Sequence, residues 1–342
     1  MIRRFRAALA ALDPFILLML GLVALASVLP VRGQGAVIAG YGANGLIVLL
    51  FFLHGAKLSR AAIVAGFGNF RLHAAVLATT FVVFPLIGLS LQALLTGAVA
   101  PGILSGILFL CLLPSTVQSS IAFTAIARGN VAAAVCSASL SNLAGIVLTP
   151  LLVALLMQQS AGVSTSSVVR IVGQLLLPFV AGHLARPLIG GAIARHKLLV
   201  GRVDRLSILA VVYTAFSASV IEGLWTKVDL ADLALVMVLC AAILAFVLWL
   251  TWWVSGKLGL AREDRVVMLF CGSKKSLASG VPMASALFPP AVLGPVMLPL
   301  MLFHQLQLIT CATIAGAMKE EAETADGGNP TAVVSPKARN SC

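Results

Sequence analysis

The sequence predicts an all-α polytopic membrane protein, in which ten transmembrane helices form two inverted five-helix repeats. Of its 342 residues, 60% are hydrophobic and only 10% are charged, whereas a soluble domain carries about 25% charged residues. Ten apolar segments each approach the roughly 20 residues that a membrane-crossing helix needs. The basic residues between these segments are concentrated in alternate loops. These three observations together predict a bundle built for the bilayer.

The predicted spans follow one another with short connections. In chain order they are residues 12–29, 36–55, 72–95, 102–127, 131–157, 168–193, 206–224, 230–254, 266–288 and 292–318. Residues 1–11 form the predicted N-terminal segment, and residues 158–167 form a polar loop. Residues 319–342 are charged and then rich in Gly, Pro and Ser, which predicts a disordered tail.

The loop charges predict the orientation. Of the 23 lysine and arginine residues, only Arg32, Arg170 and Lys227 fall in one set of loops, and Lys274 and Lys275 lie inside a span. The remaining basic residues fall in the opposite set. Basic loops stay in the cytoplasm, so we expect both termini to be cytoplasmic in a plasma membrane, the bacterial inner membrane.

The ten spans divide into a first repeat, residues 12–157, and a second repeat, residues 168–318. Five spans per half give the halves opposite orientations in the membrane. Nearly the same offset separates Pro30 from Pro187 and Pro114 from Gly272. The fourth and ninth spans are therefore interrupted at equivalent places, and paired interruptions of this kind indicate a transporter binding site near the midplane.

The fourth span carries a polar run after Pro114. Hydroxyl and amide groups can replace the hydration shell of an ion or bind a polar headgroup. Scattered Ser and Thr often bond only to carbonyls of their own helix, but a cluster beside a proline favours a site. The predicted members here are Ser115, Thr116, Gln118, Ser119 and Ser120, and the fifth span adds Ser137, Ser141 and Asn142.

The ninth span contains two adjacent lysines in an otherwise apolar run. A charge at a helix centre costs at least about 2.5–3.5 kcal/mol, so such a residue is a functional-site candidate. Flanking residues Gly272, Ser273 and Ser276 complete the predicted interruption. No Asp or Glu lies within a span centre to pair with Lys274 or Lys275.

Three roles for the lysines follow from the missing carboxylate. An anionic substrate could pair with them, or one amine could be neutral part of the time and carry H⁺, since burial disfavours the charged form. Alternatively, one lysine could be a fixed internal cation that holds two broken helices together through carbonyl groups.

Other functional classes find little support in the sequence. His304 in the tenth span is a further candidate for the site, although a lone buried histidine is often structural. The six cysteines are scattered without a C-x-x-C pair, so neither a metal site nor a disulfide framework is predicted. No nucleotide-binding motif is present. An enzyme is not indicated, because no span centre holds an acid or a nucleophile–base pair at a useful spacing. The basic residues in the loops indicate membrane topology rather than nucleic-acid binding.

Two stretches resemble the bile acid:sodium symporter family. These are Ala127-Arg128-Gly129-Asn130 after the fourth span and the run Gly272-Ser273-Lys274-Lys275-Ser276 in the ninth. The second is similar to the YfeH-like branch, which includes the seventh-member type of vertebrate solute carrier family 10. The resemblance implies a core of spans three to five and eight to ten, with the two broken helices crossing in it. It also implies a panel of spans one, two, six and seven, with a substrate crevice between panel and core.

The sequence departs from that family at the implied sodium ligands of the ninth span. The acid falls at Phe270 or Cys271, and the amides fall at Lys274 and Lys275. We therefore expect a secondary transporter of an organic anion, such as a bile-acid or steroid conjugate or another carboxylate or sulfate. It would work by alternating access in the lipid bilayer without sodium, with the lysines replacing the cation and H⁺ as the candidate coupling ion.

Two alternatives remain open at this point, a sodium-coupled bile acid-type symporter and a membrane regulator or sensor that carries no substrate. The oligomeric state is also open.

Overall fold

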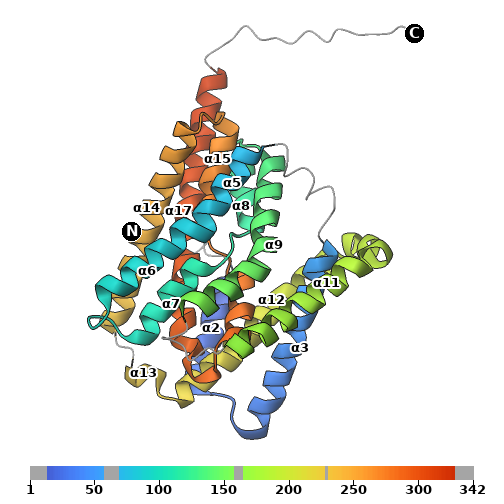
Figure 1. Ribbon diagram of the computed structural model, residues 1–342, viewed down its shortest axis with the longest axis vertical. Coiled ribbons are helices and arrows are strands. Elements are labelled where there is room, and N and C mark those ends of the chain that lie inside the picture. Colours follow the sequence, from blue (N-terminus) through green and yellow to red (C-terminus); the bar gives the residue numbers. More distant parts are fainter. Residues whose placement is uncertain (1–13, 58–68, 158–164, 228–229, 328–342) are drawn as a thin grey trace.

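The computed structural model describes residues 14–57, 69–157, 165–227 and 230–327, and this part of the chain is a bundle of helices (Figure 1). In chain order they are α2 (Pro14–Val28), α3 (Gly33–Lys57), α5 (Phe70–Ala78), the π-helix η1 (Thr79–Val83), α6 (Phe84–Leu95), α7 (Pro101–Leu112), α8 (Gln118–Ile126), α9 (Val131–Leu156), α11 (Thr165–Arg195), α12 (Lys197–Ile221), α13 (Leu224–Lys227), α14 (Leu230–Lys257), α15 (Arg262–Gly272), α16 (Leu277–Leu287) and α17 (Pro290–Gly327). Every segment predicted as a span is helical over most of its length.

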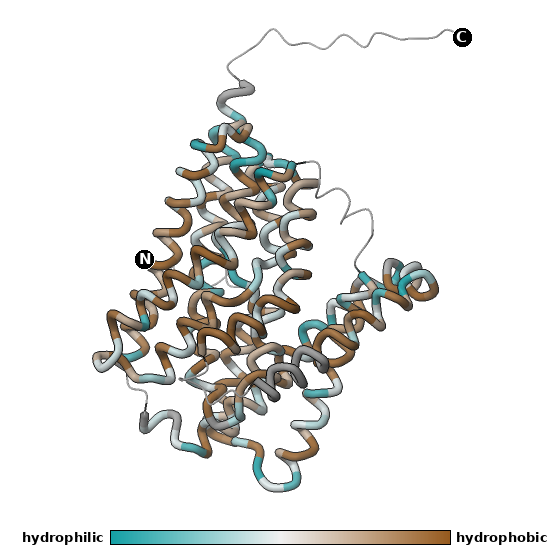
Figure 2. The backbone as a smooth tube through the Cα atoms, in the orientation of Figure 1, coloured by the Kyte–Doolittle hydropathy of each residue, from teal (hydrophilic) through white to brown (hydrophobic). Residues whose placement is uncertain are grey.

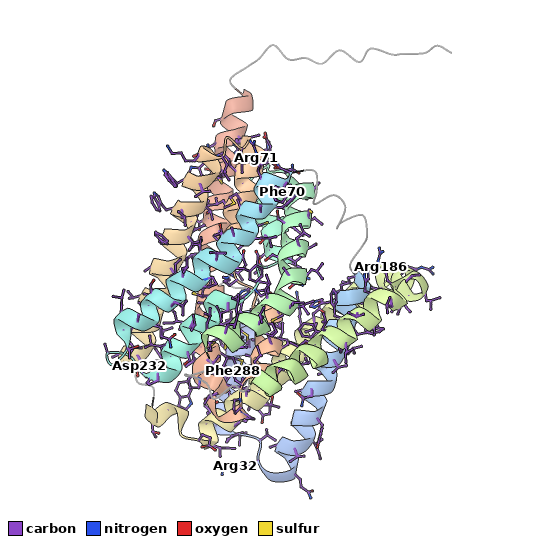
Figure 3. The ribbon with its side chains drawn as sticks, viewed as in Figure 1. Arg32, Phe70, Arg71, Arg186, Asp232 and Phe288 are labelled. Atoms are coloured by element: carbon purple, nitrogen blue, oxygen red, sulfur yellow. The ribbon has the colours of Figure 1, made fainter. Side chains whose placement is uncertain are left out.

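The helices have the length and composition of membrane spans. Within the described residues, seven are long and apolar enough to cross a bilayer, counting α5, η1 and α6 as one continuous segment. Hydrophobic residues extend along nearly the whole length of these helices, and hydrophilic residues gather toward their ends (Figure 2). Arg71 lies at one end of the bundle and Arg32 at the other (Figure 3). The protein is therefore a polytopic membrane protein.

The helices pack in two groups. In the smaller group α3 packs against α11, and α12 packs against both α2 and α3. In the larger group α17 packs against α7, α14 and α16, while α15 packs against α5, α8, α9 and α14. The groups meet where α11 contacts α9 and where α12 contacts α16 and α17.

Two of the predicted spans are each split into two helices. The chain leaves the helix between Leu112 and Gln118, which separates α7 from α8, and between Gly272 and Leu277, which separates α15 from α16. The first break is shorter than the sequence predicted. Helix α8 resumes at Gln118, so Ser119 and Ser120 lie in its first turn rather than in the break.

Several boundaries differ from the sequence prediction. Helix α12 begins at Lys197, ahead of the predicted seventh span, because the polar stretch before residue 206 is also helical. Helix α17 continues to Gly327, so the prediction of a disordered tail is wrong for residues 319–327. A Lys319–Glu323 pair at 3.8 Å, one turn apart, supports this extension. Residues 1–11, 158–164 and 328–342 lie outside the described residues.

Candidate functional site

The two breaks meet and bond to each other. The backbone N–H of Ser276, in the second break, donates to the carbonyl of Pro114, in the first, at 2.9 Å. A glycine on α16 allows this approach, since a Cβ on Gly280 would lie 2.5 Å from the Leu113 side chain in the first break. Residues distant in the sequence therefore form one polar centre inside an apolar bundle.

Side chains in and just after the first break satisfy the backbone carbonyls at the end of α15. The Ser115 hydroxyl donates to the Cys271 carbonyl at 2.6 Å, and the Ser120 hydroxyl donates to the Phe270 carbonyl at 2.9 Å. The N–H of Ser115 in turn donates to the Ser141 hydroxyl at 3.0 Å. A broken helix leaves such groups without helical partners, and buried groups must find others. These serines supply them.

Lys275 is a cation enclosed by backbone carbonyls. Its Nζ donates to the carbonyls of Thr80, Cys111 and Leu113 at 2.9, 2.9 and 2.7 Å. It also lies 4.0 Å from the centre of the Phe84 ring, and the residue is fully buried. An ammonium has three N–H donors, so each of them has a carbonyl partner.

The three carbonyls are free for identifiable reasons. The N–H of Phe84, which would reach the Thr80 carbonyl in an α-helix, donates instead to the Thr79 carbonyl of the π-helix. The following residue, Pro85, has no N–H to offer. Thr80 is therefore left with an open carbonyl. At the end of α7, the N–H that would bond to Cys111 belongs to Ser115 and points to Ser141 instead. Leu113 follows the last turn of α7 and lies inside the break.

Lys274 is also fully buried but is held much more loosely. Its Nζ donates to the Ser119 hydroxyl at 3.3 Å, at the long end of hydrogen-bond distances. It lies over the rings of Phe123 and Phe270, 4.3 and 5.6 Å from their centres. Cation–π contact compensates part of the lost hydration. Within the described residues, neither lysine forms an ion pair with a carboxylate.

A chain of hydroxyl groups runs from Lys274 across the start of α8. Ser119 accepts from Lys274 and donates to Thr116 at 2.9 Å, and the Thr116 and Ser120 hydroxyls are 2.9 Å apart. Gln118 in the same turn is exposed, and Ser119 is half-buried. The buried ammonium thus lies directly behind a polar surface of the bundle.

On α16, a second polar contact lies at the crossing. The Ser276 hydroxyl caps the helix by accepting from the N–H of Ser279, and the Ser279 hydroxyl donates to Asn142 at 2.8 Å. Asn142 is half-buried and Ala278 is exposed. The predicted residue Asn142 therefore joins the centre through Ser279, which the sequence had not singled out.

Other predicted residues lie at its edge. Ser137 pairs with His73 at 2.7 Å, away from the lysines. Ser273 donates to the carbonyl of Leu269 in its own helix, and Gly272 ends α15. His304 contacts Gln307 at 2.8 Å, and Gln307 in turn bonds to Lys275.

Sequence reasoning missed the Thr80 carbonyl and the role of Gln307. Pro85 was the available signal for Thr80, because a proline inside a span frees a carbonyl one turn earlier. Nothing local distinguished Gln307 from Gln305, since both are single amides in the same apolar helix.

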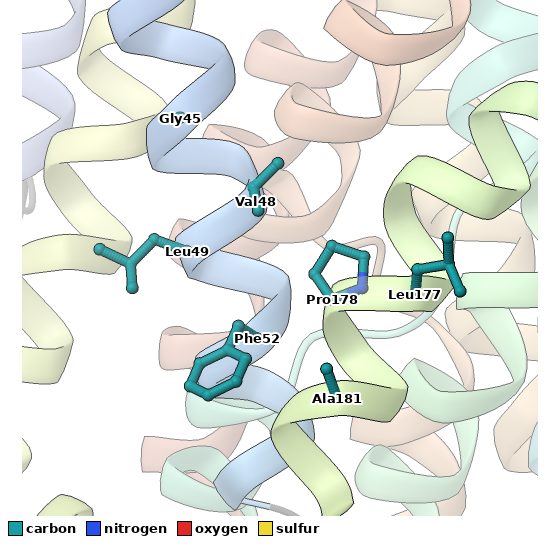
Figure 4. Close-up of a pocket in the computed structure, with 7 residues that line it drawn as sticks. All are labelled: Gly45, Val48, Leu49, Phe52, Leu177, Pro178 and Ala181. Atoms are coloured by element: carbon teal, nitrogen blue, oxygen red, sulfur yellow. The ribbon is translucent and has the colours of Figure 1, made fainter. Parts of the chain in front are cut away.

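A separate apolar groove lies between α3 and α11 (Figure 4). It has a volume of about 490 Å³. Its lining residues are Gly45, Val48, Leu49, Phe52, Leu177, Pro178 and Ala181. Among the described residues, no charged side chain lines the groove, in contrast to the polar crossing.

The chain is similar to known proteins over most of its length. The family model of the SBF-like CPA transporter family matches residues 13–320. Over 305 residues the chain is 54% identical to uncharacterized protein PA2026 of Pseudomonas aeruginosa, covering 89% of this chain and 92% of that protein. Over 313 residues it is 50% identical to the protein named "Putative symporter YfeH" of Escherichia coli, covering 91% of this chain and 94% of that one.

A more distant relative comes from a vertebrate. Sodium/bile acid cotransporter 7 of Danio rerio is 26% identical over 277 residues, which cover 80% of this chain and 82% of that protein. The extent of the family match and the relative named as a putative symporter identify a member of a transporter family rather than an enzyme. This chain belongs to the SBF-like CPA transporter family.

Proposed function

We propose that the protein is a secondary transporter that moves an organic anion by alternating access and needs no sodium, because the Lys275 ammonium stands where a coupling cation would bind. One observation carries the proposal. Three carbonyls from two different spans converge on Nζ of Lys275 at 2.7–2.9 Å. Such a carbonyl cluster is typical of a desolvated monovalent cation in a broken-helix transporter.

A resident ammonium excludes a second cation from the same place. Two unit charges 4 Å apart repel by about 4 kcal/mol at an effective dielectric constant of 20. Lys275 is covalently bound and uses all three N–H groups, so it does not leave in a transport cycle as a free ion would. Sodium binding at the crossing would therefore oppose the positive charge of this ammonium.

The anion preference rests on the outer part of the crossing. Helices α8 and α16 both begin there, and the N-terminus of a helix favours negative charge. Exposed residues lie in the first turn of each, Gln118 and Ala278. Lys274 lies behind them with only one hydroxyl partner at 3.3 Å. A carboxylate or sulfate group at this surface would gain these interactions without meeting a carboxylate of the protein.

The proposed architecture is two inverted five-helix repeats forming a core and a panel. The panel would be α2, α3, α11 and α12, and the core the remaining long helices. The two breaks support the inverted repeat because they share a contact. In each break, one backbone N–H donates to a side chain of the last helix in the same half of the chain. Ser115 bonds to Ser141 of α9, and Lys275 bonds to Gln307 of α17. With basic loops inside, both termini would be cytoplasmic in a bacterial inner membrane.

A ligand screen followed by flux tests this proposal. Purified protein in phosphatidylethanolamine–phosphatidylglycerol nanodiscs is heated with a panel of carboxylates, sulfates and steroid conjugates at two pH values. We expect some of these anions to raise the unfolding temperature of the wild type and not of Lys274→Met. The stabilising anion is then radiolabelled, and its uptake is measured in proteoliposomes with and without a sodium gradient.

The outcomes separate the alternatives. Equal uptake in sodium and choline media is the expected result. Strict dependence on sodium would overturn the proposal in favour of a sodium symporter. Anion binding without any flux would favour a sensor.

A further inference from the structure

Gln307 of α17 holds the backbone of Lys275 at two points. Its Oε1 accepts from the Lys275 N–H at 2.8 Å, and its Nε2 donates to the Lys275 carbonyl at 2.9 Å. The side chain is fully buried. We propose that Gln307 is a positioning residue that fixes the peptide of Lys275 and thereby keeps the ammonium among its three carbonyls. This inference rests on the proposed function, in which that ammonium replaces a coupling cation.

The chemistry leaves one orientation for the amide of Gln307. A backbone N–H requires an acceptor and a backbone carbonyl requires a donor, so Oε1 must face the first and Nε2 the second. The Gln307 amide thus bonds to both the N–H and the carbonyl of Lys275, as a neighbouring strand does in a β-sheet. It does so in the break, where Lys275 lies outside any helix. Both backbone groups of Lys275 depend on this side chain.

Fixing the backbone decides where the ammonium lies. A lysine side chain has four rotatable bonds, and its charged end adapts easily to other partners. Here the three carbonyls come from η1, from the end of α7 and from the residue after it, and none belongs to the break that contains the lysine. A shift of the Lys275 peptide would therefore move Nζ relative to all three at once.

His304 completes the arrangement. Nε2 of Gln307 lies 2.8 Å from Nδ1 of His304. An amide NH₂ group can only donate a hydrogen bond, so Nδ1 of His304 must be the acceptor. The ring proton of His304 is therefore on Nε2 of the imidazole. The amide NH₂ thus has both hydrogens bonded, one to Lys275 and one to His304, which opposes its rotation. This gives a specific structural role to a histidine whose part in the site was open.

Chemical labelling of the lysine amines tests the proposal. Full-length protein in nanodiscs is treated with formaldehyde and cyanoborohydride, and mass spectrometry of the peptide follows dimethylation of Lys274 and Lys275 separately. We expect Lys275 to be protected in the wild type. In Gln307→Met its labelling should rise by about tenfold or more, because both hydrogen bonds to the Lys275 backbone and the bond to His304 are lost and local opening becomes easier.

Gln305→Met is the matched control. It makes the same chemical change two residues away in the same helix, and Gln305 has a buried Oε1 without a hydrogen-bond partner. Labelling of Lys275 in this control should equal that of the wild type. If Gln307→Met unfolds earlier but leaves Lys275 as protected as before, Gln307 only fills space and the proposal is overturned.

A second variant keeps the test decisive if Gln307→Met does not fold. Gln307→Asn keeps an amide but shortens the side chain by one methylene, so its oxygen and nitrogen no longer reach the Lys275 N–H and carbonyl together. Labelling between that of the wild type and an unfolded standard supports the proposal, and labelling at the wild-type level contradicts it. The readout needs no substrate and no flux. Failure of the proposed transport activity would therefore be distinguishable from failure of this inference.

Discussion

At the scale of single residues, the central finding is that two helix breaks satisfy each other's backbone groups. The Leu112 carbonyl accepts from the Thr149 hydroxyl at 2.8 Å, in addition to the bonds made by Ser115, Ser120 and Lys275. A buried carbonyl without a partner costs about 1–3 kcal/mol. Lys275 alone satisfies three. Its charge therefore contributes to the structure as well as to the proposed exclusion of sodium.

The two lysines should respond differently to neutralisation. Lys275→Met removes the partner of three buried carbonyls, so we expect a loss of at least about 3 kcal/mol in unfolding free energy. Lys274→Met removes one long hydrogen bond and two ring contacts, and should cost about 1 kcal/mol. Thermal unfolding in nanodiscs, followed by tryptophan fluorescence, measures both. Equal losses for the two variants would contradict the division of roles described above.

Much of this centre was predictable from the sequence, and the rest was not for physical reasons. The breaks, the lysine pair and the polar run after Pro114 are local features that composition and proline placement reveal. The partners of Lys275 are backbone carbonyls, which every residue has, so residue types cannot identify them. Which lysine is enclosed depends on the direction that each takes out of the break, and only the fold sets this.

At the scale of helices, α3 and α11 approach each other so closely that glycine is required. A Cβ on Gly55 would lie 1.9 Å from the carbonyl oxygen of Phe179, and one on Gly182 would lie 1.9 Å from that of Phe52. Small residues at such contacts let membrane helices pack backbone to backbone. In Figure 1 the two helices cross within the smaller group.

Enlarging one of these glycines should separate the two helices. We expect Gly55→Ala to lower the unfolding free energy by about 1–3 kcal/mol, since the contacted atom is backbone and cannot turn away. Gly45→Ala is the control, because a Cβ there meets nothing within 4 Å. The comparison uses thermal unfolding of the three proteins in the same lipid. If Gly55→Ala unfolds at the same temperature as the wild type, α3 and α11 do not meet at this point.

The carboxylate of Asp264 connects the N-terminal ends of three helices. Asp264, in the first turn of α15, accepts from Asn69 at 2.6 Å and from Asn130 at 2.9 Å. Each asparagine also caps the helix that follows it, α5 and α9 respectively. Asp264 therefore fixes the relative positions of three helices at one end of the larger group.

Removing this carboxylate should destabilise the larger group. Asp264→Ala loses two hydrogen bonds to a charged acceptor, so we expect a cost of about 2–4 kcal/mol. Glu263→Ala is the control, because Glu263 is an exposed neighbour in the same turn, and it should leave the unfolding free energy nearly unchanged. Hydrogen exchange of α5, α9 and α15 measures the effect locally. Faster exchange confined to α15 would mean that the carboxylate does not couple the three helices.

At the scale of the whole molecule, the arrangement into two groups supports the proposed alternating access. The smaller group contacts the larger through α11 and α12, while the crossing lies entirely within the larger group. In the proposed cycle, a core that carries its cation as a side chain would move against the panel without waiting for an ion to bind. We therefore expect flux to be limited by the anion alone.

The topology makes a further prediction for the whole molecule. Both termini should be cytoplasmic, since most basic residues fall in the set of loops that shares a side with the termini, and basic loops stay in the cytoplasm. A fluorescent protein fused at the C-terminus should fold and emit, and an alkaline phosphatase fusion at the same place should be inactive. The opposite pair of results would reverse the orientation.

The most direct test of the central claim is the effect of sodium on thermal unfolding, because it needs no substrate. Wild type and Lys275→Ala are heated in nanodiscs in sodium chloride and in choline chloride at equal ionic strength. We predict that wild type unfolds at the same temperature in both salts. Lys275→Ala should unfold earlier in choline and recover in a saturable way as sodium enters the vacated carbonyl cluster. Saturable stabilisation of the wild type by sodium would contradict a resident ammonium at this place.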